Sequence, residues 1–124
     1  MKKVLALVLA GGQGKRMDIL CHVRAKPALP FAGRFRVIDF TLSNCVHSRL
    51  NNIAVLVDYQ RSLMAHYLKR WHLANASTMD FHIFEPKAGS YHGTADAVYQ
   101  NLEFIRRFPS DTVLILAGDH VYKM

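Results

Sequence analysis

The chain has 124 residues, 51% of them hydrophobic, and a formal net charge of +7 at pH 7, so it is long enough for one domain with an apolar core. Because it contains no run of eighteen apolar residues, no transmembrane helix is expected. The charge favours anionic partners. Since the cations stand singly or in pairs, without a basic stripe between aromatic residues, nucleotides and sugar phosphates suit this chain better than nucleic acid.

The first predicted element is an apolar β-strand at Val4–Ala10, which runs directly into residues 11–16, GGQGKR. Glycines lack a Cβ, so backbone N–H groups can approach a phosphate here, and the cations that follow can neutralise its charge. A Walker A loop would have glycine at Leu9 and Ser or Thr at Arg16, and the dinucleotide fingerprint would have glycine at Met17. The pattern therefore predicts a nucleotide-phosphate loop of another type, with a plain turn as the alternative.

Residues 24–36, RAKPALPFAGRFR, combine four cations with two prolines. Because proline restricts both itself and its predecessor, we expect an ordered, non-helical loop. Such a loop suits the binding of several phosphates. A solvated surface position is the favoured interpretation for Arg34, whereas Lys26, directly before Pro27, is favoured as a functional residue.

Three further segments have the apolar spacing of amphipathic helices. One begins near Asp39, one covers residues 61–72, and the clearest covers residues 94–107 with Thr94 as the predicted N-cap. The expected apolar stripe of that last helix is Ala95, Val98, Leu102 and Ile105. Residues 91–93 would then lie at a helix N-terminus, where free N–H groups can meet an anion or a base edge. A cap without a binding role is the alternative.

Besides the first strand, three apolar runs predict strands at residues 53–57, 81–84 and 112–117. Strands that alternate with helices indicate an α/β fold with a mostly parallel sheet. In such sheets, ligands bind outside the carboxyl ends of the strands. Residues 11–16, 58–60 and 118–120 each follow a predicted strand and are therefore expected to gather at one edge.

The last predicted strand is followed by Gly118, Asp119 and His120. A carboxylate at the exit of a buried strand is well placed to hold Mg²⁺, which proteins bind with one or two carboxylates plus substrate phosphates. A turn aspartate without a metal is the alternative. The other histidines show no zinc spacing and are expected at the surface. Cys21 and Cys45 are expected as reduced thiols in a cytoplasmic protein.

Four segments occur in the order and spacing of one enzyme family: LAGGQGKRM, RAKPALPFAGRFRVIDFTLSNC, YHGTADAVYQN and VLILAGDHVYKM. Together they resemble the ADP-glucose pyrophosphorylases (glucose-1-phosphate adenylyltransferases) of bacterial glycogen and plant starch synthesis. The resemblance runs from Val4 to Met124 and implies a Rossmann-like nucleotidyltransferase sandwich. On this basis, residues 1–124 are expected to form the amino-terminal part of the catalytic domain, incomplete and inactive alone. The remainder of that domain and the family's carboxy-terminal β-helix domain are expected to be absent.

The resemblance implies that ATP and glucose 1-phosphate give ADP-glucose and pyrophosphate with Mg²⁺, by direct attack of the sugar phosphate on the α-phosphorus of ATP. The implied catalytic residues are Arg16, which balances charge on the β- and γ-phosphates, and Lys26, which stabilises charge near the α-phosphate. Tyr91 is implied near the sugar phosphate, and Asp119 as a substrate-site residue that holds Mg²⁺. The implied nucleotide-binding residues are Leu9, Ala10, Gly11, Gly12, Gly14, Gly93 and Thr94.

The resemblance also implies allosteric control and a homotetrameric full-length protein. Arg24 and Arg36 match the effector region of the family and Gln60 lies in a loop tied to its activation, so a sugar-phosphate or nucleotide effector is expected. Its identity stays open, because Val23 stands where some members have an activator-binding lysine and Pro30 where some have a histidine.

Three alternatives remain at the level of the sequence. A noncatalytic regulatory member of the family would typically lack Arg16, Lys26 or Asp119, all of which are present. A pyrophosphorylase for another nucleotide sugar is disfavoured by the motif detail. A polyanion-binding module is favoured only by the net charge.

Overall fold

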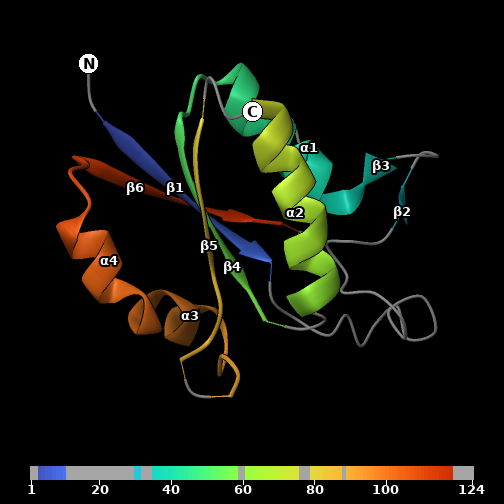
Figure 1. The fold of residues 1–124 in the computed structure, drawn as a ribbon. Helices are drawn as coiled ribbons and strands as arrows, with labels where there is room; N and C mark the ends of the chain where they lie inside the picture. Colours follow the sequence, from blue (N-terminus) through green and yellow to red (C-terminus); the bar gives the residue numbers. More distant parts are fainter. Residues whose placement is uncertain are drawn as a thin grey trace.

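The computed structural model of the chain describes residues 3–10, 30–31, 35–58, 61–75, 79–87 and 89–118. Its strands are β1 (Val4–Ala10), β2 (Pro30–Phe31), β3 (Phe35–Arg36), β4 (Asn52–Val57), β5 (Asp80–Phe84) and β6 (Thr112–Ala117). Its helices are α1 (Val37–His47), α2 (Arg61–Asn75), α3 (Thr94–Gln100) and α4 (Leu102–Arg107). Figure 1 shows the sheet between two layers of helices.

The centre of the molecule is a four-stranded sheet in the order β5-β4-β1-β6, and all three strand pairs in it are parallel. The consecutive residues of β1 from Leu5 to Val8 are fully buried, because helices cover both faces of this strand. All four strands predicted from apolar runs are confirmed, and with them the α/β fold class with a parallel sheet. Each prediction lies within one residue of the strand bounds.

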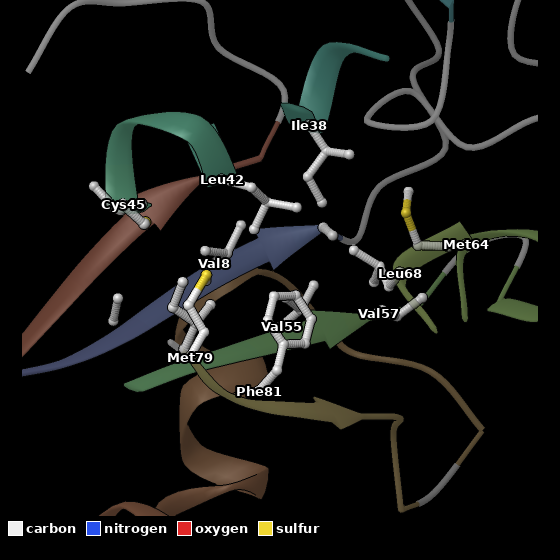
Figure 2. Close-up of a cluster of buried hydrophobic side chains, with 14 residues drawn as sticks. Val8, Ile38, Leu42, Cys45, Val55, Val57, Met64, Leu68, Met79 and Phe81 are labelled. Carbon is white, nitrogen blue, oxygen red and sulfur yellow. The ribbon is translucent and has the colours of Figure 1, made fainter. Parts of the chain in front are cut away.

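Helices α1 and α2 cover one face of the sheet (Figure 1). Their buried residues meet the alternate strand residues that point to the same side. Figure 2 shows this core, whose labelled members are Val8, Ile38, Leu42, Cys45, Val55, Val57, Met64, Leu68, Met79 and Phe81.

Burial raises the pKa of the Cys45 thiol to about 11, so the thiol stays protonated, in keeping with the reduced cysteine expected there. Arg49 follows α1 with a φ of +58°.

Helices α3 and α4 cover the opposite face (Figure 1). Leu5 and Leu7 of β1 point to this side, where aromatic rings fill the space beneath α4. The ring centroids of Phe84 and Phe104 lie 4.6 Å apart, and the imidazole of His82 lies 5.1 Å from Phe104. The surface position expected for His82 is met only in part: its side chain is 31% exposed, but its ring packs against this aromatic layer.

The helix expected at residues 94–107 is divided in two by Asn101. In a continuous helix the Asn101 backbone N–H would bond to the carbonyl of Ala97. Here the side-chain Nδ2 of Asn101 donates to that carbonyl at 2.8 Å, and the backbone N–H donates to the Val98 carbonyl at 3.1 Å. On α3, Ala97 is buried, whereas Ala95, expected on the apolar stripe, is exposed.

The segment predicted as a non-helical loop contains the short antiparallel pair β2–β3, with Pro30 opposite Arg36. These two-residue strands were not predicted. The other residues of that segment, 24–29 and 32–34, lie outside the described residues. Within the described part of the chain, no helix is long and apolar enough to cross a membrane.

Candidate functional site

The carboxyl ends of three strands meet at one edge of the sheet. Ala10 of β1 lies opposite Val57 of β4, and Leu9 lies opposite Ala117 of β6. The backbone N–H of Gly118 donates to the Leu9 carbonyl at 2.9 Å, which extends this contact beyond the end of β6. The carboxyl ends of β1, β4 and β6 therefore lie side by side, as the strand order predicts.

Gly118 lies at a closely packed point of this edge. A Cβ at this position would lie 3.0 Å from the Leu9 carbonyl oxygen and 3.3 Å from Cγ1 of Val8. The first neighbour is a backbone atom, so a residue with a Cβ would require a small shift between the ends of β6 and β1. Gly118 thus lies directly beside the end of β1.

A carboxylate ties the segment before α3 to the same edge. Asp58 follows β4 directly, and its Oδ2 accepts a hydrogen bond from the backbone N–H of Tyr91 at 3.1 Å. This contact brings Tyr91, predicted in the substrate site, to the carboxyl end of the sheet. The sequence did not identify Asp58 itself as an anchor, because its partner lies 33 residues away along the chain.

The side chain of Tyr91 is held at its far end by Asn101. Nδ2 of Asn101 donates to the Tyr91 hydroxyl oxygen at 3.1 Å. Burial raises the pKa of Tyr91, the carboxylates of Asp58, Glu85 and Asp96 raise it as well, and the Asn101 hydrogen bond acts in the opposite direction. The net direction is upward, so Tyr91 is a neutral phenol at physiological pH.

Residues 92 and 93 are fixed by a second set of hydrogen bonds. Oδ2 of Asp96 accepts from the backbone N–H of His92 at 2.8 Å and from Nε2 of Gln100 at 2.9 Å. These two donors lower the pKa of Asp96. Gln100 also accepts from the backbone N–H of Lys87 at 3.0 Å, so the turn is bound to residues on both of its sides.

The predicted N-cap of α3 is wrong by one residue. Gly93 is the cap, with φ +97° and ψ 177°, and Thr94 is the first helical residue. That backbone conformation is accessible almost only to glycine. No side chain caps this helix, and the Asp96 carboxylate in its first turn bonds to the His92 N–H outside it instead.

A third anchor lies beside the end of β6. The hydroxyl of Thr41, fully buried on α1, donates to the Ala117 carbonyl at 2.9 Å. Asp39, two residues before Thr41 on α1, is 7% exposed and accepts hydrogen bonds from the Tyr67 hydroxyl at 2.6 Å and from the Trp71 indole N–H at 2.7 Å. These contacts join α1 to the sheet and to α2.

The predicted site residues divide into two groups. Leu9 and Ala10 end β1, Arg36 lies in β3, and Tyr91, Gly93 and Thr94 lie at the start of α3. The remaining predicted residues lie outside the described part of the chain: Gly11, Gly12, Gly14, Arg16, Arg24, Lys26, Gln60 and Asp119. No group of three or more metal-ligating side chains occurs among the residues that are described. The predicted metal ligand, Asp119, is not one of them.

Sequence reasoning missed the residues that hold the site rather than those expected to touch a substrate. They are Asp58, Asp96, Gln100 and Asn101. The available signal was the spacing within YHGTADAVYQN, which places Asp96 and Gln100 four residues apart on one helix face.

Comparison with known proteins gives consistent results for sequence and fold. Glucose-1-phosphate adenylyltransferases from Thermomicrobium roseum, Hydrogenovibrio crunogenus and Dechloromonas aromatica are 50%, 48% and 45% identical to this chain over 99–100% of its length. The chain spans 30–31% of the length of these curated relatives.

A crystal structure from Bacillus anthracis, described as a glucose-1-phosphate thymidylyltransferase, superimposes with a TM-score of 0.77 at 19% identity. The match covers 98% of this chain and 46% of that one, and shows that the two share their fold. The model of the nucleotidyl transferase family matches residues 5–124. The chain therefore belongs to the nucleotidyl transferase family.

Proposed function

We propose that the protein containing this chain is a glucose-1-phosphate adenylyltransferase, which makes ADP-glucose and pyrophosphate from ATP and glucose 1-phosphate for glycogen or starch synthesis. The observation that carries this proposal is the 45–50% identity to enzymes of that name along almost the whole chain. The shared edge at the carboxyl ends of β1, β4 and β6 supports it, because α/β sheets bind nucleotides there. On this proposal, residues 1–124 form the amino-terminal part of the catalytic domain.

In the proposed reaction, a phosphate oxygen of glucose 1-phosphate forms a bond to the α-phosphorus of ATP while the bond to the pyrophosphate oxygen breaks. No general base is required, because the attacking oxygen is already anionic. Catalysis then consists of aligning two anions and balancing their charge. Arg16 neutralises the departing pyrophosphate and Lys26 the charge near the α-phosphate. Mg²⁺, with Asp119 as ligand, supplies further charge neutralisation when bound.

The nucleotide is assigned to the edge of the sheet. The glycines Gly11, Gly12 and Gly14 would contact its phosphates through the backbone, and Leu9 and Ala10 would also belong to the nucleotide site. Gly93 and Thr94 would lie beside the base, and Tyr91 would bind the sugar phosphate. The fixed turn before α3 supports these roles, since its hydrogen bonds hold residues 91–93 in one conformation.

The test is an assay of ADP-glucose and pyrophosphate formation by the whole protein, with UTP and dTTP as competing nucleotides. We expect turnover with ATP, loss of turnover when EDTA removes divalent cations, and a 10²- to 10³-fold lower kcat, to order of magnitude, in Arg16→Ala. Asp119→Asn should abolish activity or weaken the Mg²⁺ requirement. Preferred use of another nucleotide, or no turnover with an intact set of these residues, would contradict the proposal.

We further propose that the whole protein is a cytoplasmic homotetramer under allosteric control. The effector would be a sugar phosphate or a nucleotide, bound by Arg24 and Arg36 and sensed through Gln60. Arg36 lies in β3 directly before α1, which joins this segment to the core of the domain. Activation curves for Arg24→Ala and Arg36→Ala, compared with the unaltered protein, test this: the effector concentration for half-activation should rise without a change in the activity measured without effector.

A further inference from the structure

Asn101 occupies an unusual place between α3 and α4, where its side chain is 4% exposed. Its Nδ2 has two acceptors, the Ala97 carbonyl oxygen at 2.8 Å and the Tyr91 hydroxyl oxygen at 3.1 Å. A carbonyl oxygen can only accept, so the group facing Ala97 must be the amide NH₂ and not the amide oxygen. Both hydrogens of this NH₂ are then used, and because an amide NH₂ can only donate, the Tyr91 hydroxyl oxygen must accept.

The consequence concerns the proton of the Tyr91 hydroxyl. Because Asn101 donates to the hydroxyl oxygen, the tyrosine cannot donate back to Nδ2 and must direct its own proton elsewhere. No described residue accepts a hydrogen bond from it. The raised pKa keeps this proton in place at neutral pH. The backbone of Tyr91 is meanwhile tied by Asp58 to the end of β4, so the donor is fixed at both ends.

We propose that Asn101 is a positioning residue, which turns the Tyr91 hydroxyl so that it donates a hydrogen bond to an oxygen of the bound sugar phosphate. This inference rests on the proposed function and adds a residue to it that does not touch the substrate. It also explains why α3 and α4 are separate helices. One Nδ2 hydrogen of Asn101 bonds to the Ala97 carbonyl, in place of the backbone N–H that would bond there in a continuous helix. The other Nδ2 hydrogen is thereby directed at the Tyr91 hydroxyl.

The test is a double-mutant cycle in the whole protein with Tyr91→Phe, Asn101→Ala and both together. Each single variant should raise KM for glucose 1-phosphate by about 3- to 10-fold at nearly unchanged kcat, the loss expected for one hydrogen bond. The double variant should be no worse than the poorer single one, because both changes remove the same bond. Effects that multiply would mean that Asn101 acts on the fold alone, and would overturn the proposal.

Gln100→Ala is the matched control, since Gln100 holds the same turn through Asp96 without contacting the Tyr91 hydroxyl. When Gln100→Ala is combined with Tyr91→Phe, the fold-increase in KM of the double variant should equal the product of the two single increases. Should Asn101→Ala fail to fold, side-chain NMR of the unaltered protein decides. Glucose 1-phosphate should shift the Tyr91 ring resonances while the Asn101 amide hydrogens stay hydrogen-bonded, and loss of those bonds on binding would contradict the proposal.

Direct titration of glucose 1-phosphate separates this inference from the proposed function. Turnover of ATP and glucose 1-phosphate with a multiplicative cycle would overturn only the role of Asn101. Suppose instead that there is no turnover, but that glucose 1-phosphate binds. If both single variants then weaken this binding equally and the double variant weakens it no further, only the proposed reaction is overturned. Absence of both binding and turnover would overturn both.

Discussion

At the scale of single residues, the carboxylate of Asp39 shows how a charged group is accommodated in the core. It is 7% exposed, and the Tyr67 hydroxyl and the Trp71 indole N–H donate to it at 2.6 and 2.7 Å. A buried carboxylate without donors would cost several kcal/mol, whereas donors of this kind stabilise it and fix the contact of α1 with α2.

Tyr67→Phe removes one of these donors and leaves the ring in place. We expect the free energy of unfolding to fall by about 1.5–3 kcal/mol, because the lost bond is to a charged group. Tyr99→Phe is the matched control: Tyr99 is 72% exposed on α3, and its variant should lie within about 0.5 kcal/mol of the unaltered chain. Urea denaturation measures both. Equal effects would show that the bond to Asp39 contributes nothing.

Gly93 is a second residue whose identity follows from the backbone. Its φ of +97° and ψ of 177° are strained for any residue with a Cβ, although a Cβ would meet no atom within 4 Å. Gly93→Ala should therefore lower the free energy of unfolding by about 1–3 kcal/mol through backbone strain alone. Thr94→Ala, at the exposed first residue of α3, should change it by less than about 0.5 kcal/mol. Thermal unfolding of both variants checks this. If Gly93→Ala left the free energy of unfolding unchanged, the assigned backbone conformation would be contradicted.

At the scale of elements, the turn before α3 depends on the ionised Asp96. Hydrogen bonds from the His92 N–H and Gln100 hold the pKa of this carboxyl below its ordinary value. A group whose pKa is lower in the folded state contributes stability above its unfolded pKa, and loses it as the pH falls through the folded value. The turn should therefore loosen in acid, below about pH 4.

Asp96→Asn should remove this dependence. The difference in unfolding free energy between the unaltered chain and the variant is expected to shrink as the pH is lowered from 6 to 2, and His92 amide exchange should accelerate over the same range. Gln100→Ala removes one of the two donors and should bring the carboxyl pKa part of the way back to its ordinary value. NMR titration of the Asp96 carboxyl measures it, and a pKa unmoved by Gln100→Ala would rule out the bond between them.

The same element shows what the sequence can and cannot predict. The strands of the sheet were predictable from their short apolar, β-branched runs, which in β1 and β4 correspond to burial of nearly every residue. The break at Asn101 was not, because the apolar spacing continues through it and the competition of a side-chain amide with the backbone leaves no periodic signal. The anchors of the site were hidden for a related reason. Asp58 and Tyr91 are 33 residues apart and meet only because the segment before α3 lies at the edge where β4 ends.

At the scale of the whole molecule, the two helical layers do not cover the sheet equally. Leu5 and Leu7 of β1 are fully buried beneath α3 and α4, yet Val113 and Ile115, their register partners on β6, are 40% and 52% exposed. β6 is also the last strand in the order β5-β4-β1-β6, so among the described strands it pairs on one side only. Apolar exposure beside an open strand edge favours association with other chains.

We therefore expect residues 1–124, when studied alone, to self-associate as their concentration rises, and Ile115→Thr to weaken this association. Removing most of one apolar contact of this size corresponds to roughly a tenfold higher dissociation constant. Leu73→Thr is the control, because Leu73 is even more exposed, at 71%, but stands on α2 away from the sheet edge. Sedimentation velocity over a concentration series distinguishes the two. If Leu73→Thr weakens association as strongly as Ile115→Thr, the contact does not involve β6, and general surface hydrophobicity drives it instead.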